Sequence, residues 1–286
     1  MIIIDVSNIA YAAMFQHIAI QKQFPLNEDT LRHLVLNSLR ANVKKFKQVY
    51  APTSKSVVLA FDSANYWRRD LFPHYKACRR LNRANSPFDW DLIHVYMNTI
   101  MTELVQKTPY TPVLVNGAEA DDVIGTLAPL AAAQESVMII SGDKDFPQLQ
   151  TNRKISQWAP VLKKFIAEPA PELQLKQLII RGDKDDGIPN ILSADDIFVT
   201  GGRQRPISEK KLITWLTQAP EQFCDQSMLH NYYRNQKLID LTCIPTTLKH
   251  DIIQAKEQAP TVTKSQFLTY LIEKQLDNLI ACVDEF

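Results

Sequence analysis

The sequence predicts an α/β protein with a parallel central sheet, flanking helices and an all-helical C-terminal region. Over the first part of the chain, short runs of β-type residues alternate with helix-length segments, as in parallel strands joined by crossover helices. After about Glu168 the strand signals fade, and the remaining segments show helical spacing between Pro or Gly turns. These two patterns favour a sheet-based core followed by a helical region.

The predicted strands are four short apolar runs: Ile2–Val6, Ser56–Phe61, Thr111–Val115 and Val137–Ile140. Between the first two, apolar residues recur at helical spacing over Glu28–Tyr50, which predicts one amphipathic helix. Five further helices are expected in the C-terminal third: Glu172–Arg181, Ser208–Thr217, Met228–Leu241, Thr247–Lys256 and Thr263–Val283. The Pro-containing stretch Ala167–Pro171 is the expected boundary, which divides the chain into residues 1–167 and 168–286.

The composition is that of an ordinary globular protein, with 45% hydrophobic and 22% charged residues and a net charge of +1. No apolar run approaches the roughly 20 residues that cross a bilayer, so a membrane protein is not expected. The apolar N-terminus lacks a basic lead and is expected to form a strand rather than a signal peptide. Four scattered cysteines without a CxxC pair suit reduced thiols, and we expect a cytoplasmic protein.

The charges are unevenly distributed along the chain. Between Lys44 and Arg83 there are ten basic residues and only two acidic ones. Within this segment Lys76, Arg79, Arg80 and Arg83 are spaced i, i+3, i+4 and i+7, which predicts one cationic helix face. Such a face could hold phosphates, with Tyr66, Trp67 and Tyr75 available to stack on bases. The alternative is a solvated basic helix whose aromatic neighbours belong to the core.

Acidic residues follow the predicted strands at their carboxyl ends. Asp5 ends the first strand, Asp62 follows the second, and Asp143 with Asp145 follows the fourth. In an open parallel sheet these ends meet at one edge, where ligands bind. Carboxylates held close together repel one another unless divalent cations neutralise them, and oxygen ligands suit Mg²⁺ or Mn²⁺. The full set of candidate ligands is Asp5, Asp62, Glu119, Asp121, Asp122, Asp143, Asp145, Asp183 and Asp186.

Each of these acids also has an ordinary structural explanation. Glu119 and Asp121 would stabilise a helix N-terminus, Asp62 could begin a turn, and Asp185 could be solvated. A two-cation site would support phosphodiester hydrolysis without a protein nucleophile. Ser141 has no histidine placed to activate it in any recognisable pattern, and no Walker loop is present in the sequence.

The ordered motifs IIIDVSN, VLAFDSA, WRRDLFPHYKACRR, GAEADD, SGDKDF and RGDKDDGIP resemble the flap endonuclease and 5′-nuclease family, most closely the ribonuclease H of T-even bacteriophages. The resemblance spans nearly the whole chain, because NYYRNQKLIDLTCIP and the closing helix to Phe286 also look like the ends of the phage enzymes. It implies a PIN-like or 5′-nuclease-like α/β core over residues 1–167, a helical arch at about 64–86, and a DNA-binding helical region over 168–286.

The resemblance also implies roles for individual residues. Asp5, Asp62, Asp122 and Asp143 would surround one metal ion, with Asp145, Asp183, Asp186 and Glu119 toward a second and Asp121 as an outer neighbour. Tyr75, Lys76 and Arg79 would contact the scissile phosphate. Further nucleic-acid contacts are expected from Arg68, Arg69, Arg80, Arg83, Arg203, Arg205, Lys210 and Lys211.

One segment departs from the family pattern. Cellular members follow GDxxDN with a Gly-rich helix-three-turn-helix, whereas this chain has GDKDDGIPNILSADDIFVTGG. Monovalent-ion binding at that turn is therefore not expected, although the nearby basic residues could still hold duplex phosphates.

The expected activity is 5′ to 3′ hydrolysis of RNA/DNA hybrids, nicked or gapped duplex DNA and 5′ flaps. Two Mg²⁺ ions are expected, with Mn²⁺ able to substitute. The resemblance implies primer removal from lagging-strand fragments, a monomer in the host cytoplasm if the chain is phage-encoded, and a phage single-stranded DNA-binding protein and the sliding clamp as partners. The alternatives are a catalytically silent branched-DNA binding module, which would lack several carboxylates, and a PIN-type ribonuclease, which would lack the long helical C-terminal third.

Overall fold

The centre of the molecule is a six-stranded sheet with the order β3-β2-β1-β4-β5-β6. The computed structural model describes residues 1–21 and 27–286. Its strands are β1 (Ile2–Asp5), β2 (Val57–Ala60), β3 (Thr111–Val113), β4 (Val137–Ile140), β5 (Ile155–Ala159) and β6 (Lys164–Ile166). The first five are mutually parallel, and β6 pairs antiparallel to β5 at the edge. The predicted parallel sheet is confirmed, with β5 and β6 as two strands that were not predicted.

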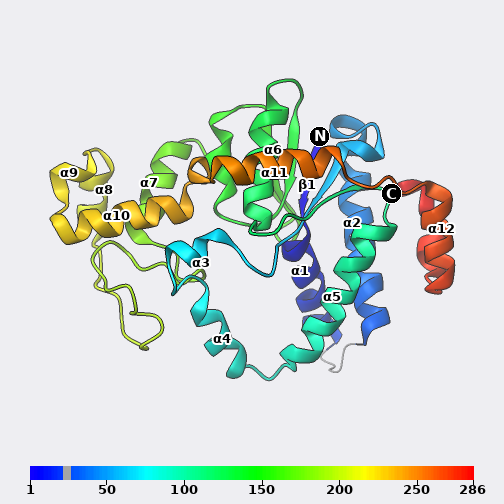
Figure 1. The fold of residues 1–286 in the computed structure, drawn as a ribbon, viewed down its shortest axis with the longest axis horizontal. Helices are drawn as coiled ribbons and strands as arrows, with labels where there is room; N and C mark the ends of the chain where they lie inside the picture. The colour runs from blue at the N-terminus through cyan, green and yellow to red at the C-terminus, as the bar shows by residue number, and fades with distance from the viewer. Residues whose placement is uncertain (22–26) are drawn as a thin grey trace.

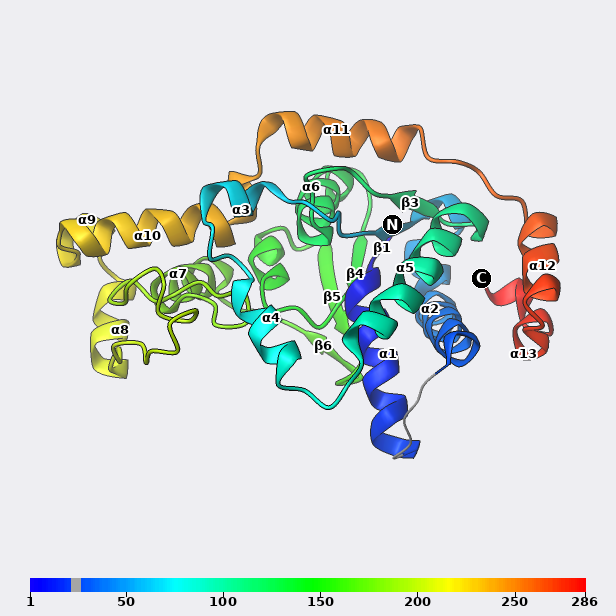
Figure 2. The same ribbon diagram turned by 60° about the horizontal axis from the view of Figure 1, so that its bottom comes forward.

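Helices cover both faces of the sheet (Figure 2). Alternate residues of the strands point to opposite faces, so Ile2 and Ile4 of β1 join one buried cluster and Ile3 joins the other. The first cluster is closed by α1 (Val6–Gln21), α2 (Glu28–Tyr50), α5 (Trp90–Lys107) and α12 (Lys264–Glu273), and the second by α6 (Ala120–Ala132) and α11 (Thr246–Glu257). Strands buried on both faces explain the continuous apolar runs of the sequence.

The segment between β2 and α5 forms an open arc along one side of the molecule (Figure 1). It contains α3 (Trp67–Leu71) and α4 (Ala77–Ala84). The expectation that Lys76 lies within a helix is wrong: it is the N-cap of α4, in the left-handed region with φ 57°. Lys76 thus lies outside the helix, although its side chain and that of Arg79 both reach Asp186.

The remaining helices lie at the two ends of the molecule (Figure 1). At one end are α7 (Pro171–Arg181), α8 (Glu209–Leu216), α9 (Pro220–Phe223) and α10 (Gln226–Ile239). From there α11 crosses over α6 to α12 and α13 (Asp277–Ile280) at the other end. The single helix predicted over Thr263–Val283 is wrong, because the chain turns at Gln275, where φ is 53°. None of the described helices combines the length and apolar character needed to span a bilayer.

A charged cluster joins α12 to the sheet-covering helices. Glu103 of α5 accepts hydrogen bonds from Arg32 Nε at 2.6 Å and from the Tyr270 hydroxyl at 2.8 Å. Lys274 Nζ lies 2.7 Å from the same carboxylate. Arg32 is almost completely buried and also pairs with Glu28 and Asp29 at the start of α2. Three helices, α2, α5 and α12, are thus tied together through one buried guanidinium and one carboxylate.

Candidate active site

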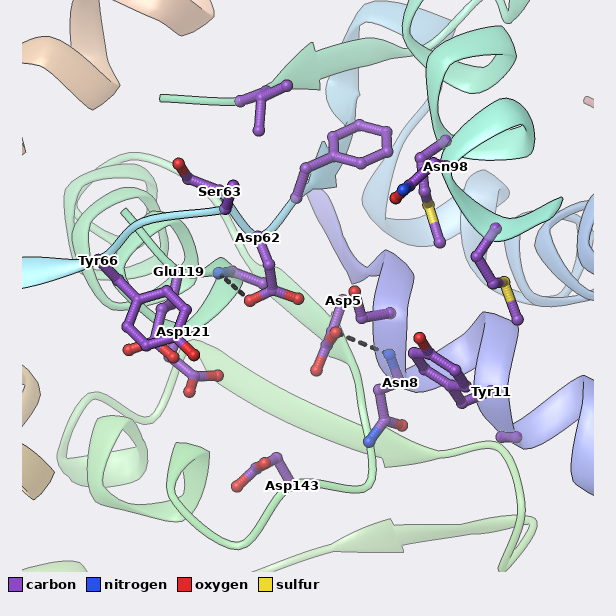
Figure 3. Close-up of a pocket in the computed structure, with 18 of the residues that line it drawn as sticks. Asp5, Asn8, Tyr11, Asp62, Ser63, Tyr66, Asn98, Glu119, Asp121 and Asp143 are labelled. Atoms are coloured by element: carbon purple, nitrogen blue, oxygen red, sulfur yellow. Dashed lines mark hydrogen bonds between the residues drawn. The ribbon is translucent and has the colours of Figure 1, made fainter. Parts of the chain in front are cut away.

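A cleft of about 1060 Å³ lies at the carboxyl edge of the parallel strands. Asp5 at the end of β1, Asp62 after β2 and Asp143 after β4 all line it (Figure 3). These acids come together because β1 lies between β2 and β4 in the sheet, so the three strands end side by side. The predicted convergence of Asp5, Asp62 and Asp143 at the carboxyl edge of the sheet is what the fold produces.

Asp5 is buried at the floor of this cleft. Its carboxylate accepts hydrogen bonds from the backbone N–H of Asn8 at 3.0 Å and from the Ser141 hydroxyl at 2.9 Å. Burial, and then the charge of Asp62, raise the pKa of Asp5 to about 7. Asn8 also accepts a hydrogen bond from Gly142 N at 3.1 Å, so it joins the loop after β4 to the start of α1. The contacts of Asn8 and Ser141 with Asp5 and its neighbouring loop were not predicted. The position of Asn8 three residues after Asp5 was the one sequence feature that could have indicated them.

The N-terminus of α6 brings two further carboxylates to the cleft, Glu119 and Asp121 (Figure 3). Asp62 accepts a hydrogen bond from Ala120 N at 2.9 Å, which joins this helix terminus to the end of β2. Burial, followed by the charge of Asp143, raises the pKa of Asp121 well above its usual range. Asp121 therefore lies among the cleft acids rather than outside them.

Asp122 lies on a different side of α6 and does not line the cleft. Its carboxylate is 2.8 Å from Arg68 Nη1 and accepts hydrogen bonds from Trp67 Nε1 at 3.2 Å and from the backbone N–H of Glu119 at 2.9 Å. The side chain is fully buried. The sequence led us to expect Asp122 among the clustered acids and Asp121 outside them. In the structure Asp121 faces the other acids, and Asp122 anchors the helix terminus to α3.

A second group of acids lies beside the first and consists of Asp143, Asp145, Asp183 and Asp186. Burial and the neighbouring charges of this group raise the pKa of Asp145 well above its usual range. Asp183 accepts a hydrogen bond from Lys144 Nζ at 2.7 Å. The tight turn before Asp183 requires a glycine, because at Gly182 φ is +67° and a Cβ would lie 2.3 Å from Ile188 O.

Cations from the arc between β2 and α5 lie against these carboxylates. Lys76 Nζ is 2.5 Å from Glu119 Oε1 and 3.7 Å from Asp186 Oδ2. Arg79 Nη2 is 2.6 Å from Asp186 Oδ1, and the Tyr75 hydroxyl is 3.1 Å from both Glu119 and Asp186. Burial opposes ionisation of Asp186, but Lys76 and Arg79 outweigh it and lower the pKa of Asp186. The three residues expected to contact phosphate therefore lie in the cleft region with the acids.

The remaining basic residues separate into buried and accessible sets. Arg68 is almost fully buried and bonded to Glu119, Asp122 and the Leu238 carbonyl, so the expectation that it contacts nucleic acid is wrong. Tyr75 is also buried, so it is not open for base stacking. Arg83 lines the cleft. The exposed basic side chains of the predicted set are Arg69, Arg80, Arg203, Arg205, Lys210 and Lys211.

The donor chemistry of the cleft fits hard divalent cations. Every candidate ligand is a carboxylate, and burial, together with the like charges of neighbouring acids, raises the pKa values of Asp5, Asp121 and Asp145. Over the described part of the chain, no three His, Cys, Asp or Glu side chains are arranged to hold an ion as they stand. Lys76 and Arg79 instead lie against Glu119 and Asp186, so an ion held by these two carboxylates would displace the two cations.

Comparison with known protein families identifies the family to which the chain belongs. The family described as "5′-3′ exonuclease, N-terminal resolvase-like domain" matches residues 1–185, which is more than half of the sequence. The chain belongs to the 5′-3′ exonuclease family. A second family, described as "T4 RNase H, C terminal", matches residues 169–286 of this 5′-3′ exonuclease family member. The resemblance found in the sequence motifs is therefore confirmed.

Among its relatives in the 5′-3′ exonuclease family is the ribonuclease H of Enterobacteria phage T4. It is 28% identical over 294 residues, covering 99% of this chain and 95% of the phage protein. The flap endonuclease Xni of Shewanella baltica is 33% identical over 156 residues, covering 51% of this chain and 55% of that protein. The chain thus matches nearly all of the first relative and about half of the second.

Two solved structures share the fold of this 5′-3′ exonuclease family member. The T5 D15 protein co-crystallised with metal ions has a TM-score of 0.61 and 17% identity, covering 90% of this chain and 97% of that one. The bacteriophage T5 D15 flap endonuclease in a pseudo-enzyme-product complex with DNA and metal ions has a TM-score of 0.61 and 18% identity, covering 90% and 99%. At these identities the similarity establishes the fold alone.

Proposed function

We propose that this chain is a two-metal-ion 5′ to 3′ nuclease that uses Mg²⁺, with Mn²⁺ as a substitute. The observation that carries the proposal is the shared cleft in which Asp5, Asp62, Asp121 and Asp143 lie together with Lys76. A phosphodiester is a polyanion, and carboxylates alone would repel it. A cleft that combines acids with raised pKa values and accessible cations suits metal-assisted phosphoryl chemistry.

The acids would hold the ions as two sets. Asp5, Asp62, Asp121 and Asp143 would hold one, and the second would be held by Asp145, Asp183, Asp186 and Glu119. Mg²⁺ held there would supply a nucleophilic water at neutral pH and would stabilise charge on the phosphate and the leaving oxygen. Asn8 and Ser141 fix the orientation of the Asp5 carboxylate through their hydrogen bonds.

Lys76, Arg79 and Tyr75 would act on the substrate phosphate. In the structure their polar atoms are engaged by Glu119 and Asp186. Divalent cations held by those carboxylates would weaken the attraction that holds Lys76 and Arg79 to them, which would leave both side chains available to the non-bridging phosphate oxygens. Tyr75 would donate its hydroxyl proton in a hydrogen bond from the wall of the site.

The proposed substrates are RNA/DNA hybrids, nicked or gapped duplex DNA and 5′ flaps, and the proposed role is primer removal during lagging-strand replication. The full-length similarity to a phage ribonuclease H and the partial similarity to a flap endonuclease support this choice. The exposed basic residues of the helical region, Arg203, Arg205, Lys210 and Lys211, would hold duplex phosphates. A monomer acting with a single-stranded DNA-binding protein and a sliding clamp is part of the same proposal.

The test is cleavage of 5′-labelled flap, nicked-duplex and RNA/DNA hybrid substrates with Mg²⁺, Mn²⁺ or EDTA, with product sizes measured on a denaturing gel. We expect short products from the 5′ end that require the metal. Asp143→Asn should abolish them while DNA binding is retained, because the change removes one carboxylate from the cleft and leaves the basic residues intact. Turnover retained in that variant would contradict the role of Asp143. Binding without cleavage by the wild-type chain under both metals would favour the silent binding module.

A PIN-type ribonuclease is the weaker enzyme alternative. The match of residues 169–286 to the C-terminal region of a phage ribonuclease H favours the 5′-nuclease proposal. Cleavage confined to single-stranded RNA in the same assay would instead favour the PIN-type activity.

A further inference from the structure

The tetrapeptide Gly-Asp-Lys-Asp occurs twice in the chain, at residues 142–145 and 182–185. Both copies form the same local turn. In each of them, the backbone N–H of the second aspartate donates a hydrogen bond of 2.9 Å to Oδ1 of the first. The two loops therefore have matching sequences and matching hydrogen bonds, so the surroundings of their two lysines can be compared directly.

The two lysines differ in what they contact. Lys144, in the first copy, reaches across to the second, where its Nζ lies 2.7 Å from Asp183 Oδ1 and 3.4 Å from Asp185 Oδ2. Lys184, the matching lysine of the second copy, is exposed to solvent. Exposure is the ordinary state of a lysine in a loop. The contact of Lys144 with Asp183, a carboxylate that is only 6% exposed, therefore calls for an explanation.

The loops on both sides of this contact are held in place by other groups. Gln174 of α7 donates a hydrogen bond of 2.9 Å from Nε2 to the carbonyl of Lys144, and Gln157 of β5 donates one of 2.7 Å to the carbonyl of the preceding residue. Asp183 follows Gly182, where a Cβ would collide with backbone atoms. Lys144 and Asp183 thus meet because the fold fixes both loops, which distinguishes the pair from a chance contact between mobile surface side chains.

The hydrogen bonds of Asp183 use only one of its carboxylate oxygens in this contact. Oδ1 accepts from Lys144 Nζ and from the backbone N–H of Asp185, which takes both of its lone-pair directions. An ion held by Asp183 would therefore bind Oδ2. The ammonium and the ion would then share one carboxylate, and two positive charges placed so close together repel one another.

We propose that Lys144 is a counter-charge that lowers the affinity of the second acid group for its divalent cation. The inference rests on the proposed nuclease function, which assigns Asp183 and Asp145 to that ion. Lys144 would compensate the charge of Asp183 while the ion is absent. Mg²⁺ is commonly held by one or two carboxylates together with substrate phosphates. By weakening the site, Lys144 would make firm binding of the second ion depend on the oxygens of a substrate phosphate.

The opposite effect would follow if Lys144 only oriented Asp183 for the ion. Removing Lys144 would then weaken ion binding, whereas removing a counter-charge strengthens it. We expect the repulsion to be the larger effect, because the ion carries two charges and the site is partly shielded from water. The hydrogen bond from Asp185 N also continues to orient Asp183 when Lys144 is replaced. The sign of the change in affinity therefore distinguishes the two roles.

A count of bound Mn²⁺ tests the counter-charge without cleavage. Electron paramagnetic resonance measures free Mn²⁺ during titration of the full chain in the absence of nucleic acid. The Lys144→Met variant should bind its weaker ion about tenfold more tightly than wild type, because a unit charge beside the site is removed. Lys144→Arg keeps the charge and should stay within about threefold of wild type.

The matched control is Lys184→Met, which removes a lysine from the other copy of the same tetrapeptide. Its charge is exposed and screened by solvent, so the affinity should change by less than about twofold. If Lys144→Met does not fold, Lys144→Gln replaces it, because the amide keeps an N–H donor for Asp183 and lacks the charge. The expected gain in affinity has the same direction.

The Mg²⁺ dependence of single-turnover cleavage provides a second readout. On a 5′ flap substrate, Lys144→Met should reach its half-maximal rate at a lower Mg²⁺ concentration than wild type. The Lys184→Met variant should follow the wild-type curve. A lower Mg²⁺ requirement in both variants would assign the effect to net charge and would overturn the role of Lys144.

The other outcomes separate this inference from the proposed function. Wild-type protein that binds two ions and cleaves, with an unchanged Mn²⁺ affinity in Lys144→Met, would overturn the counter-charge alone. Weaker binding in Lys144→Met would assign Lys144 to the orientation of Asp183 and would also overturn it. If neither wild type nor Lys144→Met bound Mn²⁺ or cleaved any substrate, the proposed function would be refuted and this inference with it.

Discussion

Arg68 and Asp122 form a buried ion pair, with Arg68 Nη1 2.8 Å from Asp122 Oδ1 and neither side chain more than 2% exposed. The pair joins α3 of the arc to the N-terminus of α6, beside two acids of the cleft. Removing one partner of a buried pair leaves the other charge uncompensated, which is far more costly than losing an exposed pair. This contact therefore separates the two adjacent aspartates into one that is paired in the interior and one that lines the cleft.

The first prediction contrasts those two aspartates. Asp122→Asn should lower the free energy of unfolding by about 1–3 kcal/mol, because buried Arg68 then keeps only Glu119 as a charged partner. Asp121→Asn should raise stability in EDTA, since it removes one of several mutually repelling buried charges, and should abolish cleavage. Urea unfolding and the flap assay on both variants measure the difference. If Asp122→Asn were as stable as wild type but inactive, Asp122 rather than Asp121 would be the residue needed at the site, as expected from the sequence.

The second prediction concerns metal binding and stability. If the proposed function holds, divalent cations bind the clustered carboxylates only in the folded protein, so Mg²⁺ at about a hundred times its dissociation constant should stabilise the fold by about 2.7 kcal/mol. Thermal unfolding across a Mg²⁺ titration, with reversal by EDTA, measures this gain. The Asp143→Asn variant is the control and should gain less at every concentration. An unfolding temperature independent of Mg²⁺ and Mn²⁺ would argue against cation binding in the cleft.

The third prediction tests whether cleavage needs the ammonium of Lys76 or only the left-handed backbone at that position. Lys76 has φ 57°, a conformation that glycine adopts more readily than other residues. Lys76→Ala and Lys76→Gly should both slow cleavage much more than they weaken DNA binding, because each removes the ammonium. If Lys76→Gly cleaved at the wild-type rate, the ammonium would have no role in the reaction. Single-turnover rates and binding isotherms on one flap substrate provide the comparison.

The fourth prediction concerns duplex contacts in the helical region. Lys210 and Lys211 are exposed on α8, away from the cleft lining. The double variant Lys210→Ala/Lys211→Ala should weaken duplex affinity and reduce the slope of log affinity against log salt by about 1.8 if both contact phosphates. The cleavage rate at saturating substrate should be unchanged. A salt slope equal to that of wild type would show that neither lysine meets the duplex.

The fifth prediction is a pH dependence of stability at Glu103. Burial opposes ionisation of this carboxyl, but hydrogen bonds from Arg32, Lys274 and Tyr270 outweigh it and lower the pKa of Glu103 below its usual value of 4.5. A depressed folded-state pKa stabilises the protein above the unfolded-state pKa, and this contribution is lost as the pH falls through the folded-state value. Glu103→Gln should therefore be less stable than wild type at pH 7, and the gap should narrow below pH 4.5. A gap that is constant from pH 7 to pH 3 would contradict this.

Periodicity in the sequence was sufficient to predict most of the fold. The helix predicted over Glu28–Tyr50 has those bounds in the structure, because a wide apolar stripe and capping by Asn27 both mark it. Strand β5 was missed because it carries Gln157, a buried polar residue bonded to the carbonyls of Ser141 and Asp143. Such a residue breaks the apolar run, and only its distant partners make it compatible with a strand. Strand β6 has three residues and no buried face to produce a pattern.

The site was predictable in its composition and less so in its geometry. Strand ends predicted that Asp5, Asp62 and Asp143 would meet, since the topology alone brings them together. Whether Asp121 or Asp122 faces that cleft depends on partners more than fifty residues earlier, Arg68 and Trp67, and adjacent residues of a helix differ by about 100° in direction. Likewise, the left-handed conformation of Lys76 before α4 depends on tertiary structure, and the helical spacing of the basic residues does not predict it.

The position of β1 in the sheet has a consequence for how the chain folds during its synthesis. Strand β1 leaves the ribosome well before its neighbour β4, which begins only at Val137. The Met1 amino group lies 2.6 Å from Glu135, a contact that also waits for this late segment. Such distant pairings slow folding, and until β4 arrives the emerging chain carries an unpaired apolar edge. Nascent fragments that end before about residue 140 should therefore be protease-sensitive and prone to aggregation.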